Sequence, residues 1–481
     1  MSGRLERFGN ALPEPAALFA LAFIAVHLLS AIGPWPTVMD ASGATVVVTS
    51  LLTPDGLAQA LTRAVSNFVA FPPLGVVLVM MLGVGVAEQS GFVAAAVTPL
   101  ITATPRRWLA PATVLAGILF HVAADAGFVL LLPLAAAAWH TAGRHPLAGI
   151  AAAYAGLSGG FAANLVPGPI DPILAGLTEQ AARIVDPAAS VGPLANWTFT
   201  ASSALVLVAV GGWVTDRYVE PALASREIAP PTALTERAAS PAGGLLALGV
   251  VLALAGVAIA IPGSPLRGEG DNPLAPNAPW LRAVGTLLAL GLGIAGAVHG
   301  RVHGTLPTHR HVVSAMANGM TQMSGYLVLA FAAAQFLDAF DRSGIGRWLA
   351  IGGAQTLGQL ALPEPALVVV IVIAVALLNL VIASASAKFA IVAPVIVPMA
   401  MLLGVDPATT MAAFRVGDGV TNVLTPLMPY VPLVLELVRR WSPTAGTGTL
   451  WALMWPYSAS FAVCWTAWLL VFVAAGWPLG L

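Results

Sequence analysis

The sequence has little charge and almost no cysteine. Of its 481 residues 9% are charged, with 20 Lys and Arg against 21 Asp and Glu, and 58% are hydrophobic. Soluble globular chains carry about 25% charged residues, so this composition, with a mean hydropathy of +0.88, indicates a polytopic membrane protein and excludes most soluble enzymes. Without a basic block, nucleic-acid binding is excluded as well. The single cysteine, Cys464, permits neither an internal disulfide nor a CxxC motif.

The motifs of common catalytic sites are also missing. The chain has no His-Glu-x-x-His helix, no Gly-x-Ser-x-Gly elbow and no phosphate-binding loop. The Gly-x-Gly-Asp signature of an intramembrane aspartyl protease would need glycine where the chain has Arg415. We therefore expect neither enzymatic activity nor a cofactor, and no ATP-driven transport by this chain alone.

Apolar runs long enough to approach a membrane span recur along the chain. A spanning helix needs about 20 mostly apolar residues, which predicts about nine to eleven crossings. The runs begin near Ala16, Phe71, Trp108, Pro146, Phe199, Pro241, Ala283, Ser324, Pro365, Phe389, Val423 and Leu450. Polar loops at 216–240 and 262–282 divide the chain into two halves. Arg4 and Arg7 precede the first run, which favours a cytoplasmic N-terminus in the cytoplasmic (inner) membrane.

The two halves resemble each other. The stretch from Asp125 to Pro133 aligns without gaps on that from Ser386 to Pro394, sharing an alanine, a phenylalanine and the proline. A second apolar segment follows about 34 residues later in each half, interrupted in the order Gly, Asn, Pro, and a preceding helix ends in Ser-Gly in both halves. These residues are Gly160, Asn164 and Pro167, then Gly419, Asn422 and Pro426, with Ser90-Gly91 and Ser343-Gly344. Paired interrupted segments of this kind are typical of secondary transporters, because unwound backbone at membrane depth survives only where it lines a cavity.

Five charged residues lie in or beside apolar segments: Asp125, Asp171, Lys388, Arg415 and Asp418. A charge there costs about 2.5–3.5 kcal/mol unless it faces a cavity or a partner, so each is a candidate site residue. Lys388 is the only lysine and follows a run of small residues that suits a hairpin tip. One interpretation is a lysine that extends to the membrane interface. The other is a tip whose hydroxyl and carbonyl groups, such as Ser386, bind a sodium ion or a carboxylate.

Arg415 and Asp418 share a helix face and can neutralise each other. Glycines flank Asp418, however, and Asn422 and Pro426 follow, which makes helix continuity doubtful there. A guanidinium beside a broken helix suits a substrate carboxylate. Asp418 can then bind a proton or help to hold a sodium ion.

The stretch 158–172 contains three glycines and three prolines and must bend or unwind. Asn164 can offer its amide to an ion or a substrate there, while Asp171 either titrates or caps the following helix. His121, one turn before Asp125, is interpreted as a packed, hydrogen-bonded histidine. Four further histidines, at 299, 303, 309 and 311, have no carboxylate or cysteine beside them, and we expect no metal site in that segment.

The two interrupted segments resemble the AbgT family of p-aminobenzoyl-glutamate transporters, which includes antifolate efflux pumps. The matching stretches are SGGFAANLVPGPIDPILAGLTEQAARIVDP from Ser158 and SASAKFAIVAPVIVPMAMLLGVDPATTMAAFRVGDGVTNVLTPLMPY from Ser384. Agreement extends to ERFGNALPEP near the N-terminus, FPPLGVVLVMMLGVGVAEQSG from Phe71 and SGYLVLAFAAAQF from Ser324. The resemblance therefore covers nearly the whole chain.

This resemblance implies an all-α polytopic membrane protein with about nine transmembrane helices, two re-entrant hairpins, an inverted internal repeat, an inner core and an outer scaffold. It also implies a homodimer in the lipid bilayer. We expect an N-terminal span and amphipathic segment at 1–70, a first repeat with hairpin and broken helix at 71–215, connecting loops and spans at 216–310, a second repeat at 311–440, and a C-terminal span at 441–481.

By motif matching, the family's functional positions fall on Asp171 of the first hairpin region, Ser386 of the second tip, and Pro407, Arg415, Asp418 and Pro426 around the following broken helix. The tryptophan that usually follows the Ser-Ala-Lys run is Phe389 here, which keeps an apolar face for an aminobenzoyl ring but lacks the indole N–H. We expect Asn164, Ser386, Asn422 and Asp418 to bind the coupling ion, sodium or a proton. Asp125, Lys388, Gly160 and Gly419 are expected to support the site.

The function expected from these features is gradient-driven secondary transport of p-aminobenzoyl-glutamate or related aromatic amide and antifolate compounds. One alternative is a sulfonamide efflux antiporter without p-aminobenzoyl-glutamate activity. A non-transporting membrane subunit, whose buried charges only pair with each other, is a second, and a membrane enzyme that uses the two aspartates is a third.

Overall fold

The computed structural model describes residues 15–33, 35–39, 45–224, 239–273, 278–380, 382, 384–425, 428 and 430–481. Over these ranges the chain is mostly helical, and the only sheet in them is the antiparallel pair β1 (Val38–Met39) and β2 (Thr45–Val46). The predicted all-α fold class is confirmed.

The elements of the first half are α2 (Pro15–Ala31), α3 (Pro54–Thr62), α4 (Ala64–Val69), α5 (Pro72–Gln89), α6 (Phe92–Thr102), η1 (Arg106–Trp108), α7 (Leu109–Leu119), η2 (Phe120–Ala123), α8 (Ala124–Thr141), α9 (Pro146–Tyr154), η3 (Ala155–Gly159), α10 (Ile170–Ala182), α11 (Trp197–Val214), η4 (Thr215–Val219) and α12 (Glu220–Leu223). Those of the second half are α13 (Ala242–Ala260), η5 (Glu269–Asp271), α14 (Pro279–Val302), α15 (His309–Gln322), α16 (Ser324–Arg342), α17 (Ile345–Gly358), α18 (Glu364–Asn379), α19 (Ala385–Leu402), α20 (Pro407–Asn422), α21 (Val431–Trp441) and α22 (Thr447–Ala475).

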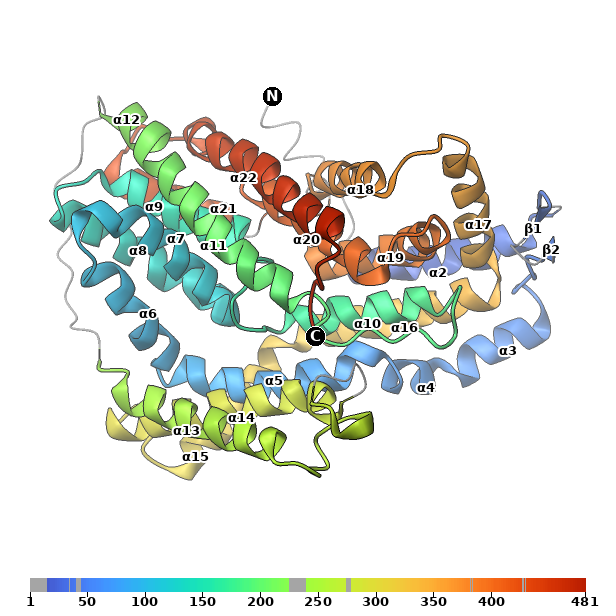
Figure 1. The fold of residues 1–481 in the computed structure, drawn as a ribbon, viewed down its shortest axis with the longest axis horizontal. Coiled ribbons are helices and arrows are strands. Elements are labelled where there is room, and N and C mark those ends of the chain that lie inside the picture. Colours follow the sequence, from blue (N-terminus) through green and yellow to red (C-terminus); the bar gives the residue numbers. More distant parts are fainter. Residues whose placement is uncertain are drawn as a thin grey trace.

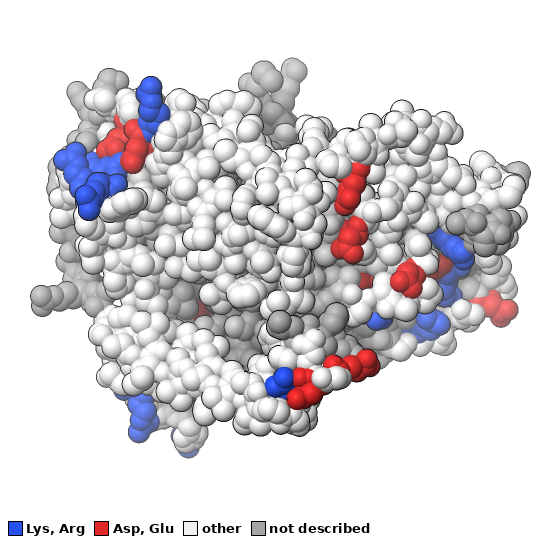
Figure 2. Space-filling view, in the orientation of Figure 1, with Lys and Arg blue, Asp and Glu red and all other residues white. Residues whose placement is uncertain are grey.

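Long apolar helices dominate the described part of the chain. Five helical stretches in it are long and apolar enough to cross a membrane: Trp197–Leu223, Ala242–Ala260, Ala283–Val302, Ala385–Leu402 and Thr447–Ala475. Two bent pairs, α5 with α6 and α15 with α16, also qualify as broken spans. The surface in Figure 2 is largely uncharged, with charged side chains confined to a few small groups, as a bilayer requires. The exact number of crossings and the domain boundaries stay predictions.

The Ser-Gly corners have the same geometry in both halves. Gly91 and Gly344 have φ of 81° and 73°, a left-handed conformation that glycine adopts at little cost, and each begins a new helix, α6 or α17. In both corners the serine hydroxyl donates to the carbonyl three residues earlier, 2.9 Å away, and accepts from the N–H two residues later, 3.2 Å away. The predicted repeat is therefore visible in the backbone as well as in the sequence.

The order of elements after each corner is also the same. A hairpin of two helices follows, α7–η2–α8 or α18–α19, and then an interrupted helix, α9–η3 followed by α10 or α20 followed by α21. The aligned residues Asp125 and Ser386 are the second residues of α8 and α19. In Figure 1 these hairpins and interrupted helices lie above α5, together with α11 and α22, and α13, α14 and α15 lie together below α5.

The expected loss of helix at the glycines around Asp418 is wrong. Helix α20 is continuous from Pro407 to Asn422, and its glycines serve close packing instead. A Cβ atom at Gly417 would lie 2.5 Å from the carbonyl oxygen of Val372, and one at Gly419 would lie 2.8 Å from that of Gly159. The interruption begins only after Asn422.

Candidate functional site

Asp171 and Arg415 form a buried ion pair between the two repeats. Arg415 Nη2 lies 2.8 Å from Asp171 Oδ1, and the two side chains are 1% and 7% exposed. The other carboxylate oxygen accepts hydrogen bonds from the Gly168 N–H at 2.6 Å and from Asn164 Nδ2 at 2.7 Å. Asp171 lies in the first turn of α10, after the interruption, rather than in the first hairpin as the motif match implied. Asp171 therefore binds the interrupted backbone at Gly168 and also pairs with Arg415 of the second repeat.

The donors and acceptors of this pair are not all used. Among the described residues, Arg415 Nε and Nη1 have no hydrogen-bond partner, and neither does Asn164 Oδ1, although all three atoms are buried. Burying an unsatisfied polar group costs about 1–3 kcal/mol, and more for a charged group. The N–H groups of Nε and Nη1 can therefore donate to a bound anion, whereas the amide oxygen of Asn164 suits a donor or a cation.

Lys388 and Asp418 form a second buried pair. The Lys388 ammonium contacts Asp418 Oδ1 and also donates to Asn379 Oδ1, and the lysine and aspartate side chains are 0% and 1% exposed. Of the two interpretations of Lys388, a lysine that extends to the membrane interface is therefore wrong. The suggestion that Arg415 and Asp418 neutralise each other is also wrong, because each pairs with a partner on another helix, α10 or α19.

Two asparagines complete the second pair. The Asn379 amide donates to the Asp418 carbonyl at 2.8 Å and to Asn422 Oδ1 at 2.9 Å. Asn422 Nδ2 in turn faces Asp418 Oδ2 at 3.2 Å and the Ser158 carbonyl, across the repeat boundary, at 3.4 Å. The ends of α18 and α20 are thus joined to the π-helical turn η3 of the first repeat.

An aromatic pair lies beside these charges. Phe389 is fully buried in α19, and its ring centroid lies 4.3 Å from that of Phe414 on α20. Lys388 Nζ is 5.6 Å from the centroid of the Phe414 ring. The residue in place of the family tryptophan therefore adjoins the second ion pair.

The remaining predicted residues lie at different distances from this network. Ser386 is in the first turn of α19, partly exposed, with its Oγ 3.5 Å from Ser384 Oγ. Pro407 is the first residue of α20, about 12 Å along the helix axis from Arg415, and no contact brings it to the network. A Cβ at Gly160 would lie 2.5 Å from Ile118 Cγ1, which indicates a packing role. Pro426 and the side chain of Asp125 lie outside the part of the chain that the structure describes.

The sequence did not single out one residue of the network, Asn379. Asn379, which binds both members of the second pair, is a polar residue at the end of the apolar run of α18, and this position was a usable signal. His121, interpreted as a packed histidine, does bond the Ile118 carbonyl, at 2.7 Å from Nδ1. Its ring also adjoins the first pair, because a Cβ at Gly168 would lie 2.8 Å from His121 Nε2 and 4.0 Å from Asp171 Oδ2.

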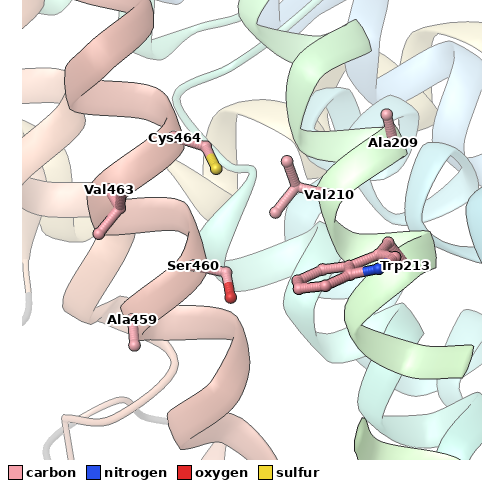
Figure 3. A pocket seen from close by; sticks show the side chains of 7 residues that line it. All are labelled: Ala209, Val210, Trp213, Ala459, Ser460, Val463 and Cys464. Carbon is pink, nitrogen blue, oxygen red and sulfur yellow. The ribbon is translucent and has the colours of Figure 1, made fainter. Parts of the chain in front are cut away.

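Two other concave surfaces lie away from the network. A groove of about 570 Å³ between α11 and α22 has Trp213 and Ser460 on its opposite walls, near Cys464, and no charged residue in its lining (Figure 3). A polar cavity of about 330 Å³ at the far end of α10 is lined by Arg63 and Asp338, which already pair at 2.8 Å. The groove does not suit a carboxylate, whereas the network does. The charged side chains of the network are buried, so the candidate site is closed to solvent in this conformation.

Known transport proteins are similar to this chain over nearly its whole length. The model of the AbgT putative transporter family matches residues 1–481. A p-aminobenzoyl-glutamate transport protein of Escherichia coli (strain K12) is 33% identical over 485 residues, covering 99% of this chain and 95% of that protein.

Two solved structures are similar throughout. The Alcanivorax borkumensis YdaH transporter has a TM-score of 0.93 and 40% identity, covering 98% of this chain and 100% of that one. Neisseria gonorrhoeae MtrF, whose structure is described as illuminating a class of antimetabolite efflux pumps, has a TM-score of 0.89 and 39% identity, covering 98% and 97%.

The fold and the buried charge network define a multi-pass membrane transport protein rather than an enzyme. The chain belongs to the AbgT transporter family.

Proposed function

We propose that this protein is an ion-gradient-driven secondary transporter of p-aminobenzoyl-glutamate or related aromatic amide and antifolate compounds. The observation that carries this proposal is the fully buried Arg415, which has two nitrogens without a partner in the described chain. These nitrogens can donate to a substrate carboxylate, and Phe389 offers an apolar face nearby. The Escherichia coli relative named for p-aminobenzoyl-glutamate supports the choice of substrate.

Charge balance supports coupling to a cation. The described site holds two cations, Arg415 and Lys388, and two carboxylates, Asp171 and Asp418, and is neutral as a whole. An anionic substrate would add uncompensated charge to a buried site, which is costly unless cations enter with it. Asn164, Ser386, Asn422 and Asp418 supply oxygen atoms for sodium, and the aspartates supply sites for protons.

The proposed setting is the cytoplasmic membrane, with the N-terminus on the cytoplasmic side and two copies forming a homodimer. The excess of arginine before the first span supports this orientation.

Uptake of radiolabelled p-aminobenzoyl-glutamate into proteoliposomes tests the proposal, under a sodium gradient and separately under a proton gradient. We expect accumulation that follows one gradient and falls at least about tenfold in Arg415→Ala, because a charged hydrogen bond contributes about 1.5–3 kcal/mol. Arg440→Ala is the matched control, since Arg440 is exposed and pairs with the exposed Glu436, at 2.8 Å. Unchanged accumulation in folded Arg415→Ala protein would contradict the assignment of Arg415.

The second candidate is a sulfonamide efflux antiporter without p-aminobenzoyl-glutamate activity. Phe389 in place of the family tryptophan and the likeness to MtrF favour it. In the same vesicles, gradient-driven movement of a labelled sulfonamide together with no movement of p-aminobenzoyl-glutamate would select this function.

A further inference from the structure

Lys388 is placed unusually for a structural lysine. It is the only lysine of the chain, it is fully buried, and its ammonium contacts Asp418 and Asn379. Replacing a buried ion pair by apolar residues of similar size is often neutral or stabilising, so fold stability alone does not explain a lysine here. A lysine whose ammonium exchanges Asp418 for another anion does explain a buried charge at this position.

The two buried cations form a matched set. Arg415 and Asp418 lie three residues apart on α20, about 4.5 Å along the helix axis, and each anchors one ion pair. Each cation is neutralised by a carboxylate of the protein, Asp171 or Asp418. A dicarboxylate can therefore bind to both cations when these protein carboxylates release them.

We propose that Lys388 is the second substrate-carboxylate anchor and that the site selects dicarboxylates, with one carboxylate on Arg415 and the other on Lys388. This inference rests on the proposed function. Asp418 releases Lys388 when it takes up a proton or a sodium ion, so the positive charge of the coupling cation replaces that of the lysine. No covalent bond is formed or broken in this exchange.

Asn379 gives the Lys388 ammonium a hydrogen-bond acceptor that stays in place while Asp418 is exchanged for the substrate. Its Oδ1 accepts from Lys388, while its Nδ2 is held by the Asp418 carbonyl at 2.8 Å and by Thr421 Oγ1 at 3.0 Å. The amide is therefore fixed through the backbone of α20 and does not depend on the Asp418 carboxylate. Lys388 keeps one protein acceptor and directs its other donors to the substrate.

Equilibrium binding to purified protein tests the inference independently of transport. The probes are p-aminobenzoyl-glutamate, p-aminobenzoyl-glutamine, which lacks the γ-carboxylate, and p-aminobenzoyl-γ-aminobutyrate, which lacks the α-carboxylate. We expect the natural protein to bind each monocarboxylate at least about tenfold more weakly than the dicarboxylate, one charged hydrogen bond being lost.

The double variant Lys388→Gln/Asp418→Asn keeps the site neutral. We expect its affinities for the dicarboxylate and for the monocarboxylate that keeps the carboxylate bound by Arg415 to agree within about twofold. Its affinity for the other monocarboxylate, which lacks the carboxylate bound by Arg415, should stay lower. Glu436→Gln/Arg440→Gln, which removes an exposed pair, is the matched control and should keep the natural preferences. Full discrimination in the Lys388 double variant would overturn the inference.

A single variant covers the case in which the double variant does not fold. Asp418→Asn releases Lys388 without removing it, so its preference for the dicarboxylate should equal or exceed that of the natural protein. Loss of that preference would also overturn the inference. If the natural protein binds none of the three probes, the proposed substrate itself fails, whereas a failure confined to the Lys388 and Asp418 variants leaves that proposal intact.

Discussion

Asp171 is the carboxylate on which the first half of the network depends. It joins the Gly168 backbone, Asn164 and Arg415, so Asp171→Asn leaves a buried guanidinium without a counter-charge. Breaking such a pair from one side costs about 3–5 kcal/mol. We therefore expect Asp171→Asn to lower the thermal unfolding midpoint of the detergent-solubilised protein and to reduce transport at least about tenfold.

Removing both charges separates the two effects. Asp171→Asn/Arg415→Gln should recover most of the lost thermal stability, because no uncompensated charge remains, but it should not recover transport. The exposed Asp186, at the other end of the α10 segment, provides the control Asp186→Asn, which should alter neither property. Transport restored in the double variant would show that the pair only stabilises the fold.

The sequence indicated the charged residues of the buried network better than their pairing. Asp171, Lys388, Arg415 and Asp418 are conspicuous because each interrupts an apolar run. Which carboxylate meets which cation depends on how α10, α19 and α20 pack, and spacing along one helix suggested the wrong partner for Arg415. Asn379 escaped notice because a single amide at a helix end carries no charge to mark it.

At the level of the helices, glycine sets how closely α20 approaches its neighbours. A Cβ at Gly419 would lie 2.6 Å from the Trp465 ring and 2.8 Å from the Gly159 carbonyl oxygen. We expect Gly419→Ala to destabilise the protein by about 1–3 kcal/mol, the usual cost of overpacking, and to reduce transport by displacing Asp418. The melting temperature of the purified variant measures the first effect and vesicle uptake the second.

Gly249→Ala is the matched control for Gly419→Ala. It lies inside α13, and a Cβ there would meet nothing within 4 Å. Alanine is favoured over glycine in a helix interior by about 0.5–1 kcal/mol, so this variant should be neutral or slightly stabilising. Equal behaviour of the two variants would argue against a close-packing role for Gly419.

The repeat was the element-level feature that the sequence predicted most clearly. The Ser-Gly corners and the aligned starts of α8 and α19 follow from residues that determine local geometry, namely a left-handed glycine and small residues at a helix start. The sequence did not predict that α20 is continuous. Glycine occurs where a helix is interrupted, but it also occurs where two backbones pack closely. Only the neighbouring helices distinguish these two uses.

Across the whole molecule, the site lies where the two repeats touch. Asp171 and the Ser158 carbonyl come from the first repeat, and Arg415 and Asn422, which contact them, come from the second. A movement of one repeat against the other would therefore open or close the site, which is how alternating access operates in transporters built from inverted repeats. The side chains of the network are closed off from solvent in this conformation.

This geometry predicts that the tip of the second hairpin changes its accessibility during transport. Ser386 is partly exposed at the start of α19, and the only native thiol, Cys464, lies in the groove between α11 and α22 and can be removed as Cys464→Ala. In that background, we expect Ser386→Cys to react with a membrane-impermeant maleimide from one side of the vesicle, and more slowly when substrate and coupling ion are both present, because the hairpin closes over them. Asp186→Cys, which is exposed at the end of the α10 segment, should react at a constant rate. Equal labelling of Ser386→Cys with and without substrate would mean that the second hairpin does not move as the site fills.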